Sequence, residues 1–259
     1  MTGVILKAPA GADFSGSAIG WDAGVNAGLA YANFYGATAA KNVRNLAVGG
    51  PTPKIVGAPT QNANSVVLLD AANYIDTGVS QTADLTALVV FKATADGGSS
   101  MVLGNYKSPR LNDTVQSSGY SVYTVPGSNT TDNIVSVRLN ASEYSGVAGD
   151  ASAALTLEAS GREPVGVFKA FAARCRSADK VRTVFDLGVG DFVTVTGTQT
   201  IDVAAGTIRI GSSYGVAGPF PNTCEVAFAG IWNVALTDAQ IQTVYARVKA
   251  VMASAGIAV

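Results

Sequence analysis

The chain of 259 residues contains no histidine. A Ser-His-Asp or Cys-His arrangement, a histidine-ligated zinc ion and imidazole acid–base catalysis are therefore excluded. Loops of the Gly-x-x-x-x-Gly-Lys-Ser/Thr or Gly-x-Gly-x-x-Gly type, which cradle phosphates after a strand, are missing as well. Few of the common routes to catalysis remain open to this sequence.

Charge is also scarce. Asp, Glu, Lys and Arg make up 14% of the residues, and the formal net charge is -1. Because no basic stripe exists to neutralise a phosphate backbone, nucleic acid is not an expected partner. No run approaches the roughly 20 apolar residues of a membrane helix, so no membrane insertion is expected. Residues 1–9 lack the basic flank and extended apolar core of a secretory signal.

The chain has two cysteines, Cys175 and Cys224. They belong to no Cys-x-x-Cys pair, which excludes a zinc ribbon and a thioredoxin-like motif. Two strands of one sandwich could bring them together as a disulfide, but buried thiols are favoured because nothing else indicates an oxidising compartment. Loop Asp and Asn residues show no EF-hand or Asp-x-Asp spacing, so we expect no metal and no other cofactor.

What the sequence does contain is a series of short β-type runs, which begins at Leu29 and is interrupted by Gly, Pro, Asn and Asp. Residues 134–140 alternate between apolar and polar, as in a strand with one wet face. Residues 85–92 are apolar on both faces, as in a central strand covered by a second sheet or a neighbouring subunit. About ten strands are expected, which favours two packed sheets. The other candidate strands are 119–125, 154–158, 165–174, 181–187, 192–196, 207–210 and 225–232.

One strong helix is predicted over 238–254. Thr237 can cap it, and Gln240 three positions later completes a capping box. Gly256 is positioned to stop it. Apolar residues recur at three- and four-residue spacing and form a stripe that can dock on the sandwich. These residues are Ile241, Val244, Tyr245, Val248, Val251 and Met252.

Two parts of the chain are expected. Residues 1–28 lack periodicity and are predicted to form an N-terminal arm or docking segment, while residues 29–259 form the sandwich with its helix. Trp21 is a candidate anchor of that arm on a neighbouring subunit. Surplus helix surface, the two-sided strand at 85–92 and the low charge together predict a homo-oligomer, with a trimer as one candidate.

The end of the chain carries a family resemblance. Gly-Thr-Ile-Arg-Ile-Gly at 206–211, then the strand and capped helix of 228–241, resemble the closing segment of laminin-G-like (concanavalin A-like) jelly-roll domains. Residues 68–78, ending in Tyr-Ile-Asp-Thr-Gly, are similar to an early segment of that family, and residues 101–104 with 119–123 to the next hairpin. The resemblance implies an all-β, two-sheet antiparallel jelly-roll sandwich with one C-terminal α-helix. It also implies a glycan-binding or structural role.

A narrower resemblance is to bacteriophage virion proteins that carry such domains on tails, baseplates or capsids. It depends on residues 42–51 and 56–60, the composition rich in Ala, Gly, Thr and Val, and the N-terminal arm. It implies a virion protein assembled in the host cytoplasm, whose partners are other virion proteins, copies of itself and a host-surface glycan.

Glycan binding needs an aromatic platform for the C–H face of a sugar, beside planar hydrogen-bonding groups on loops. Tyr106, Arg110 and Tyr214 fall in predicted loops and are the candidate carbohydrate-binding residues. The alternative is that these loop residues and the strand aromatics simply pack the sandwich. Trp232 alternates with Val226 and Phe228 and is predicted to lie in the core.

The enzymatic alternative is glycoside hydrolysis by two carboxylates. Glucanases that resemble this fold carry Glu-x-Asp-x-Glu on one strand, and no segment here matches. The four glutamates are isolated: Glu143, Glu158, Glu163 and Glu225. The sequence therefore favours a non-enzymatic protein, and the resemblance described above implies a phage virion structural protein with a lectin-like domain. Its alternatives are a glycan-binding adhesin and a glucanase-type glycosidase.

Overall fold

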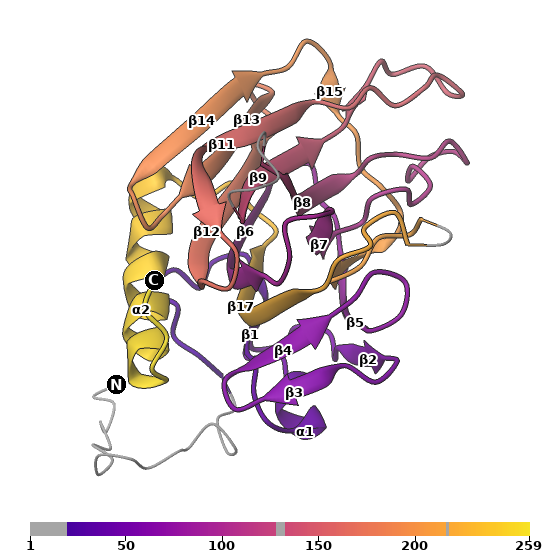
Figure 1. Cartoon of the computed structure of the whole chain (residues 1–259). Helices are drawn as coiled ribbons and strands as arrows, with labels where there is room; N and C mark the ends of the chain where they lie inside the picture. The colour runs from indigo at the N-terminus through magenta and orange to yellow at the C-terminus, as the bar shows by residue number, and fades with distance from the viewer. Residues whose placement is uncertain (1–19, 128–132, 216–217) are drawn as a thin grey trace.

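The computed structural model describes residues 20–127, 133–215 and 218–259, without the side chains of 160 and 161. Within these residues the chain forms two antiparallel sheets stacked as a sandwich (Figure 1). The strands of the first sheet are β1 (Leu29–Phe34), β3 (Thr60–Asn62), β4 (Ser65–Leu68), β6 (Leu85–Ala93), β12 (Lys169–Arg176), β13 (Val181–Asp186), β14 (Asp191–Thr196) and β17 (Cys224–Trp232). The strands of the second are β2 (Lys54–Val56), β5 (Tyr74–Ser80), β7 (Ser100–Gly104), β8 (Tyr120–Pro126), β9 (Ile134–Ala141), β11 (Thr156–Pro164) and β16 (Thr207–Ile210).

The first, eight-stranded sheet runs in the order β14-β13-β12-β6-β17-β4-β3, with β1 also paired to β17. The second, seven-stranded sheet runs in the order β11-β9-β8-β7-β16-β5-β2. Short β10 (Glu143–Tyr144) and β15 (Thr200–Ile201) pair with each other, and α1 (Ala39–Asn42) is a single helical turn. The long helix α2 spans Asp238–Ser254, as predicted. The all-β jelly-roll sandwich with a C-terminal helix is confirmed.

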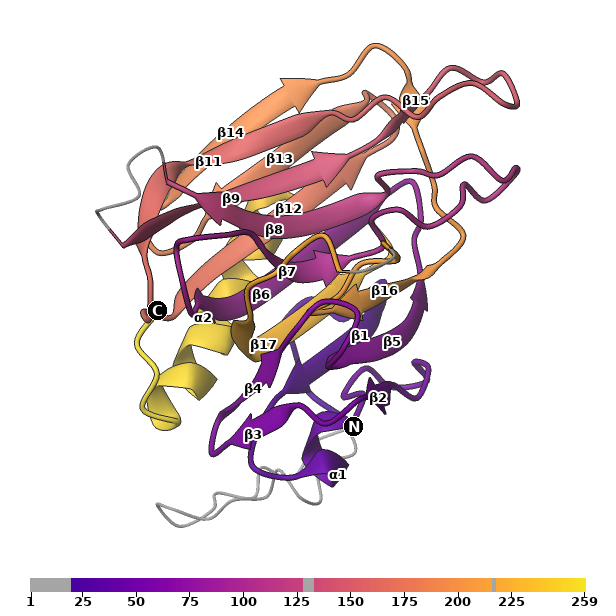
Figure 2. The same cartoon turned by 45° about the vertical axis from the view of Figure 1, so that its right-hand side comes forward.

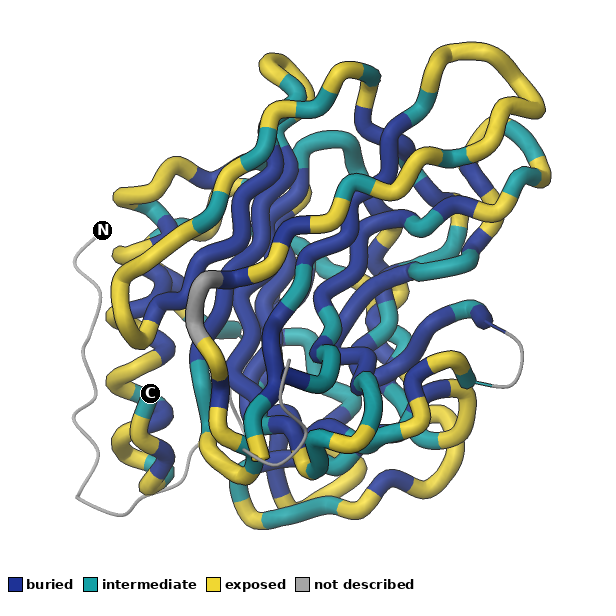
Figure 3. The backbone as a smooth tube through the Cα atoms, turned by 45° about the horizontal axis from the view of Figure 1, so that its top comes forward, coloured by how far each residue is buried: buried dark blue, intermediate teal, exposed yellow. Residues whose placement is uncertain are grey.

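One hydrophobic core fills the space between the sheets. Side chains alternate across a strand, so every second residue of each strand points inward. On β9, Val137 and Leu139 belong to this core, and Val135, which the sequence pattern placed on the same face, is buried as well. Figure 3 shows the result, with buried central strands and exposed connecting loops. Full burial of each such aliphatic side chain contributes about 1.5–3 kcal/mol.

A second hydrophobic core lies between the eight-stranded sheet and α2, which runs along the outer side of that sheet (Figures 1 and 2). On β6, Leu88 and Val90 face this core, while Val89 and Phe91 face the other one. The two-sided apolar strand is therefore covered by the second sheet and by the chain's own helix. Two of the observations that predicted a homo-oligomer are thus explained within one chain, because the apolar stripe of α2 and the outer face of β6 bury each other.

The ends of α2 follow the sequence signals. The Gln240 backbone N–H donates to Thr237 Oγ1 over 3.3 Å, and the Thr237 N–H donates to Gln240 Oε1 over 2.8 Å, which completes the capping box. At the other end Gly256 has a φ of 76°, and the Ile257 N–H donates to the Met252 carbonyl over 2.9 Å. This Schellman motif needs a residue that accepts positive φ, which explains the glycine.

Trp21 packs on its own chain. The ring of Trp21 lies edge-on to Phe34 at 5.2 Å and to Phe228 at 5.4 Å. The backbone N–H of Trp21 donates to the Leu46 carbonyl over 3.0 Å. Trp21 thus lines the second core and stays half-buried, because the aromatic residues of β1 and β17 offer it a surface. Its role as an anchor on a neighbouring subunit stays a prediction. Residues 1–19 of the predicted arm lie outside the described residues.

Trp232 is buried, as predicted, and its Nε1 donates to the Val25 carbonyl over 2.8 Å. A bulge in β17 between Val226 and Phe228 turns these two apolar side chains to different cores. In the described part of the chain, no helix is long and apolar enough to cross a bilayer.

Cys175 and Cys224 are unpaired and buried, so the favoured interpretation of the two cysteines as buried thiols is confirmed. Burial raises the pKa of each thiol to about 12. We therefore expect neither thiol to react with a chromogenic disulfide reagent at about pH 8 in the folded protein, since the thiolate is the reactive form. Both should react once denaturant is added. A thiol that reacts at the same rate with and without denaturant would contradict this burial.

Candidate functional site

The outer face of the seven-stranded sheet carries aromatic side chains. On β5 and β16, Ile75 and Ile208 point into the core, so Tyr74 and Arg209, next along each strand, point outward. Tyr123 on β8 points outward in the same way. No helix packs on this face among the described residues, because α2 belongs to the other sheet.

The connection between β16 and β17 adds more rings to this face. The Tyr214 N–H donates to the Tyr106 carbonyl over 2.7 Å, so the structure brings two of the predicted site residues together. The ring of Phe220 lies 5.6 Å from that of Tyr106 and 5.5 Å from that of Tyr123, both edge-to-face. A single apolar ring thus joins a strand residue to a loop residue.

Arg209 continues the series. Its guanidinium carbon lies 3.5 Å from the ring centre of Tyr214 and 4.7 Å from that of Tyr74. One Nη donates to the Ser213 carbonyl over 2.8 Å, which holds the side chain in this stack. Cation–π contacts of this kind contribute about 0.5–2 kcal/mol each. We call the set made of Tyr74, Tyr106, Tyr123, Tyr214, Arg209 and Phe220 the tyrosine row.

The four tyrosines of the row are each half-buried, and the ring of Tyr214 is covered by the guanidinium of Arg209. The hydroxyl of Tyr214 is fixed from below, since it donates to the Thr207 carbonyl over 3.1 Å. Rings that are held in one orientation lose little conformational entropy when a ligand stacks on them. The row is therefore a preformed aromatic platform.

Asp70, in the turn after β4, anchors the loop that carries Tyr214 and Phe220. Its buried carboxylate accepts the Ser213 N–H over 2.7 Å and the Phe220 N–H over 3.3 Å. It also accepts the hydroxyls of Ser212 and Ser213 at 3.0 Å. A charged acceptor with several donors is one of the stronger polar anchors in a protein. Asp70 is a positioning residue for both rings.

Asn105 performs the same task for Tyr106. Its buried side chain accepts the Tyr120 N–H over 2.9 Å and donates to Gln81 Oε1 over 2.9 Å and to the Gly206 carbonyl over 3.1 Å. The amide thereby ties the end of β7 to β8 and to the segment before β16. This network fixes the turn on which Tyr106 lies.

Arg110 does not join the row. It is 2% exposed, its Nε donates to Asp202 over 3.0 Å, and its two Nη atoms donate to Asp113 over 2.8 Å and to the Asp150 carbonyl over 2.9 Å. Its guanidinium also stacks 4.1 Å from the ring centre of Tyr144. The guanidinium therefore cross-links three loops of the fold, and its burial separates it from any ligand on the outer face.

Sequence reasoning missed Tyr74 and Arg209. It placed Tyr123 and Phe220 in aromatic stretches but did not select them as site residues. Strand alternation in Tyr-Ile-Asp-Thr and Thr-Ile-Arg-Ile was the available signal for Tyr74 and Arg209, because it turns them away from the isoleucines. The role of Asp70 had no local signal, since its partners are more than 140 positions away in the sequence.

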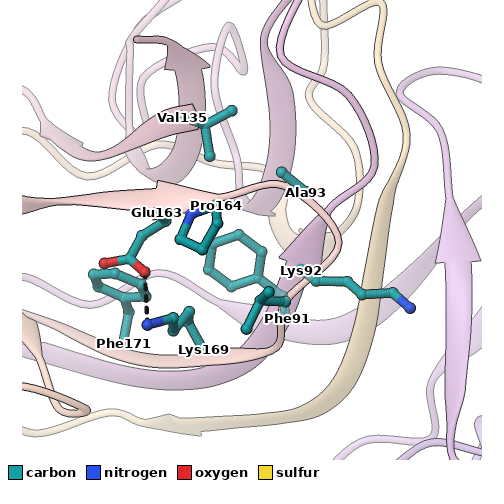
Figure 4. A pocket seen from close by; sticks show the side chains of 9 residues that line it. Phe91, Lys92, Ala93, Val135, Glu163, Pro164, Lys169 and Phe171 are labelled. Carbon is teal, nitrogen blue, oxygen red and sulfur yellow. Dashed lines mark ion pairs between the residues drawn. The ribbon is translucent and has the colours of Figure 1, made fainter. Parts of the chain in front are cut away.

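A small cavity at one end of the sandwich is a second candidate (Figure 4). Phe91 and Phe171 line it, and Lys169 Nζ lies 3.2 Å from Glu163 Oε2 at its rim. Its volume of about 10 Å³ is at the lower limit for one water molecule. Burial, and then the adjoining carboxylate of Asp186, raise the pKa of Glu163. The cavity is too small for a sugar ring, so this carboxyl pair is no site for glycoside hydrolysis.

The other three glutamates each pair with a cation. Glu158 lies 2.7 Å from Arg138, Glu225 lies 2.8 Å from Lys92, and Glu143 lies 3.5 Å from Arg182. Among the residues that the structure describes, no group of three or more Cys, Asp or Glu side chains is arranged to hold a metal ion.

Glu163 gives a pH-dependent prediction. Because the pKa of Glu163 in the folded protein is raised above its ordinary value of 4.5, the folded state binds this proton more tightly than the unfolded state does. This group therefore favours folding at low pH, and that contribution is lost as the pH rises above 4.5. We expect Glu163→Gln, which mimics the neutral acid, to raise the unfolding temperature at neutral pH and to flatten its decline between acid and neutral pH.

Glu158→Gln on the same strand is the control. Burial raises the pKa of Glu158, but the hydrogen bond from Arg138 outweighs it and lowers this pKa overall. The Glu158→Gln variant should therefore show a pH dependence of stability that is opposite in sign and smaller. Glu163→Gln with a lower unfolding temperature than the unsubstituted protein at neutral pH would contradict the assignment.

The Asp70 anchor gives a second prediction. Asp70→Asn replaces a carboxylate oxygen by an NH₂ group that faces donors, so we expect the free energy of unfolding to fall by about 2–3 kcal/mol. Asp179→Asn, which removes an exposed ion pair with Arg176, should cost much less, because solvent screens that pair. Urea titrations of both variants test this. Equal losses in the two variants would reject the anchoring role.

Comparison with known proteins supports the fold. No protein-family model and no curated protein matches the sequence. Among solved structures, the binding domain of botulinum neurotoxin serotype D superposes with a TM-score of 0.58 at 8% identity, over 86% of this chain and 53% of that one. Sialidase from Trypanosoma rangeli in complex with sialic acid superposes with a TM-score of 0.52 at 12% identity, over 84% of this chain and 32% of that one. The chain thus spans about half the length of the toxin domain, and it shares with these proteins a jelly-roll β-sandwich fold.

Proposed function

We propose that this chain is a non-enzymatic carbohydrate-binding module and that the tyrosine row is its ligand-binding face. The observation that carries the proposal is the hydrogen bond that brings Tyr214 to Tyr106 on a face with no helix in the described residues. Fixed, half-exposed aromatic rings suit the apolar C–H face of a sugar, and hydroxyls at their edges suit its polar groups.

The solved structures of similar fold support a carbohydrate ligand. The serotype D ligand-binding domain, in complex with N-acetylneuraminic acid, superposes with a TM-score of 0.58 at 9% identity, over 89% of this chain and 53% of that one. The sialidase structure contains sialic acid. At such low identity no residue of these proteins is carried over, so the proposal for this chain depends on its own row of rings.

We also propose the setting. The resemblance of residues 42–51 and 56–60 to bacteriophage virion proteins supports a place on a tail, a baseplate or a capsid surface, with other virion proteins and copies of this chain as partners. The ligand is then a glycan of the host surface. An exposed platform favours receptor binding over a purely structural role, since a structural protein needs no such face.

Removal of rings tests the proposal. We expect Tyr106→Ala to lower glycan affinity by about tenfold, because it removes a stacking surface worth about 1 kcal/mol or more. Tyr214→Ala should lower the affinity as well, because it removes the ring on which Arg209 is stacked. The measurement is binding of the purified chain and its variants to a glycan array and to intact bacterial cells.

Phe192→Ala is the matched control, because Phe192 is 55% exposed on β14 of the other sheet. It should leave binding unchanged. Tyr106→Phe keeps the ring and should keep most of the affinity, and circular dichroism checks that each variant is folded. A folded wild-type protein that binds neither glycans nor cells would reject the proposal.

A further inference from the structure

Lys107 follows Tyr106 of the tyrosine row and has a left-handed backbone conformation, which is unfavourable for a lysine. The Ser108 N–H donates to the Asn105 carbonyl over 3.0 Å and closes a turn in which Lys107 has a φ of 62°. Glycine or asparagine adopts this left-handed conformation readily, whereas a long side chain does so at a cost. Strained residues of this kind gather where a site needs them.

The ammonium group of Lys107 has no ion pair and no hydrogen bond among the described residues. The ammonium lies over the ring of Tyr106, with Nζ 5.8 Å from the ring centre. Lys180 is a useful comparison, because it too has a left-handed backbone, with a φ of 58°. The Nζ of Lys180 donates to the Thr198 carbonyl over 2.9 Å, so this lysine contributes a hydrogen bond to the fold. The ammonium of Lys107 makes no hydrogen bond of that kind to the described residues.

The carboxylates near the row are already engaged. Asp70 accepts the donors of its serine loop, and Asp76 accepts the Thr207 hydroxyl over 2.7 Å and the Gly78 N–H over 3.0 Å. Arg209 adds a second positive charge, stacked on Tyr214. Two cations therefore accompany the pair of rings formed by Tyr106 and Tyr214.

Building on the carbohydrate-binding function proposed above, we propose that the ligand is an anionic sugar and that Lys107 selects it. The sugar ring stacks on Tyr106 while the ammonium of Lys107 pairs with a carboxylate or sulfate on that sugar. A charge-assisted hydrogen bond beside an aromatic platform discriminates strongly against the neutral analogue, which leaves the cation without its partner. A requirement for this positive charge would explain why a lysine occupies a position whose backbone conformation favours glycine.

The test compares Lys107→Gly with Lys180→Gly. Both substitutions relieve a left-handed lysine, so both should maintain or raise the unfolding temperature. Lys107→Gly alone should lower affinity for sialyllactose or sulfated lactose by about tenfold and weaken the salt dependence of binding. Lys107→Arg, which keeps the charge, should retain the preference for anionic sugars. Lys107→Asn tolerates the turn and serves as a second neutral variant.

The probes separate the possible results. Tighter binding of sialyllactose than of sulfated lactose assigns the anion as a carboxylate, and the reverse assigns it as a sulfate. Equal affinity of the wild-type protein for lactose and for both anionic forms, or no effect of Lys107→Gly, overturns the role of Lys107 and leaves carbohydrate binding intact. No binding to any of the three sugars overturns both proposals.

Discussion

Burial of both faces of the eight-stranded sheet is the constraint on which the rest of the molecule depends. Every residue of β17 is buried, with one set of side chains against the seven-stranded sheet and the other against α2 and the segment around Trp21. A sheet so covered has no outer surface left for a ligand in its centre. No helix covers the seven-stranded sheet in the described residues, and its outer face keeps four half-buried tyrosines, so the proposed recognition is placed there. Stability thus depends most on the sheet that is covered on both faces, and the recognition that we propose depends on the other sheet.

Buried polar side chains connect that division to the loops. Asp70, Asn105 and Arg110 each lie under a loop and satisfy several donors or acceptors that are distant in the sequence. Such networks are costly when one member is missing, and rigid when all are present. Asp70 and Asn105 hold the segments that carry Tyr214, Phe220 and Tyr106, whereas Arg110 ties together loops outside the tyrosine row. Precise side-chain placement of this kind lets a binding face on loops act as if it were built on strands.

Local signals in the sequence predicted the fold well, and long-range contacts limited the prediction of the site. The capping box at Thr237 and the glycine at 256 set both ends of α2, because each acts within a few residues. The connection at 165–168 was assigned to a strand, whereas it crosses from one sheet to the other. There the Val165 N–H donates to the Asn133 carbonyl over 3.0 Å. No local pattern signals such a crossing.

The two arginines near the predicted site show the same limit. Arg110 and Arg209 are both close to tyrosines in space, but Arg110 is enclosed by Asp113 of its own loop and by Asp202 and Asp150 of distant loops, and Arg209 lies on the outer face because its strand alternates. The distant partners are what bury Arg110, and a local sequence pattern does not show them. The fold itself depends on alternation and burial, which many sequences satisfy. Proteins with 8–12% sequence identity can therefore share this sandwich fold. The residues on the outer face of the seven-stranded sheet can differ between them, because the core does not depend on those residues.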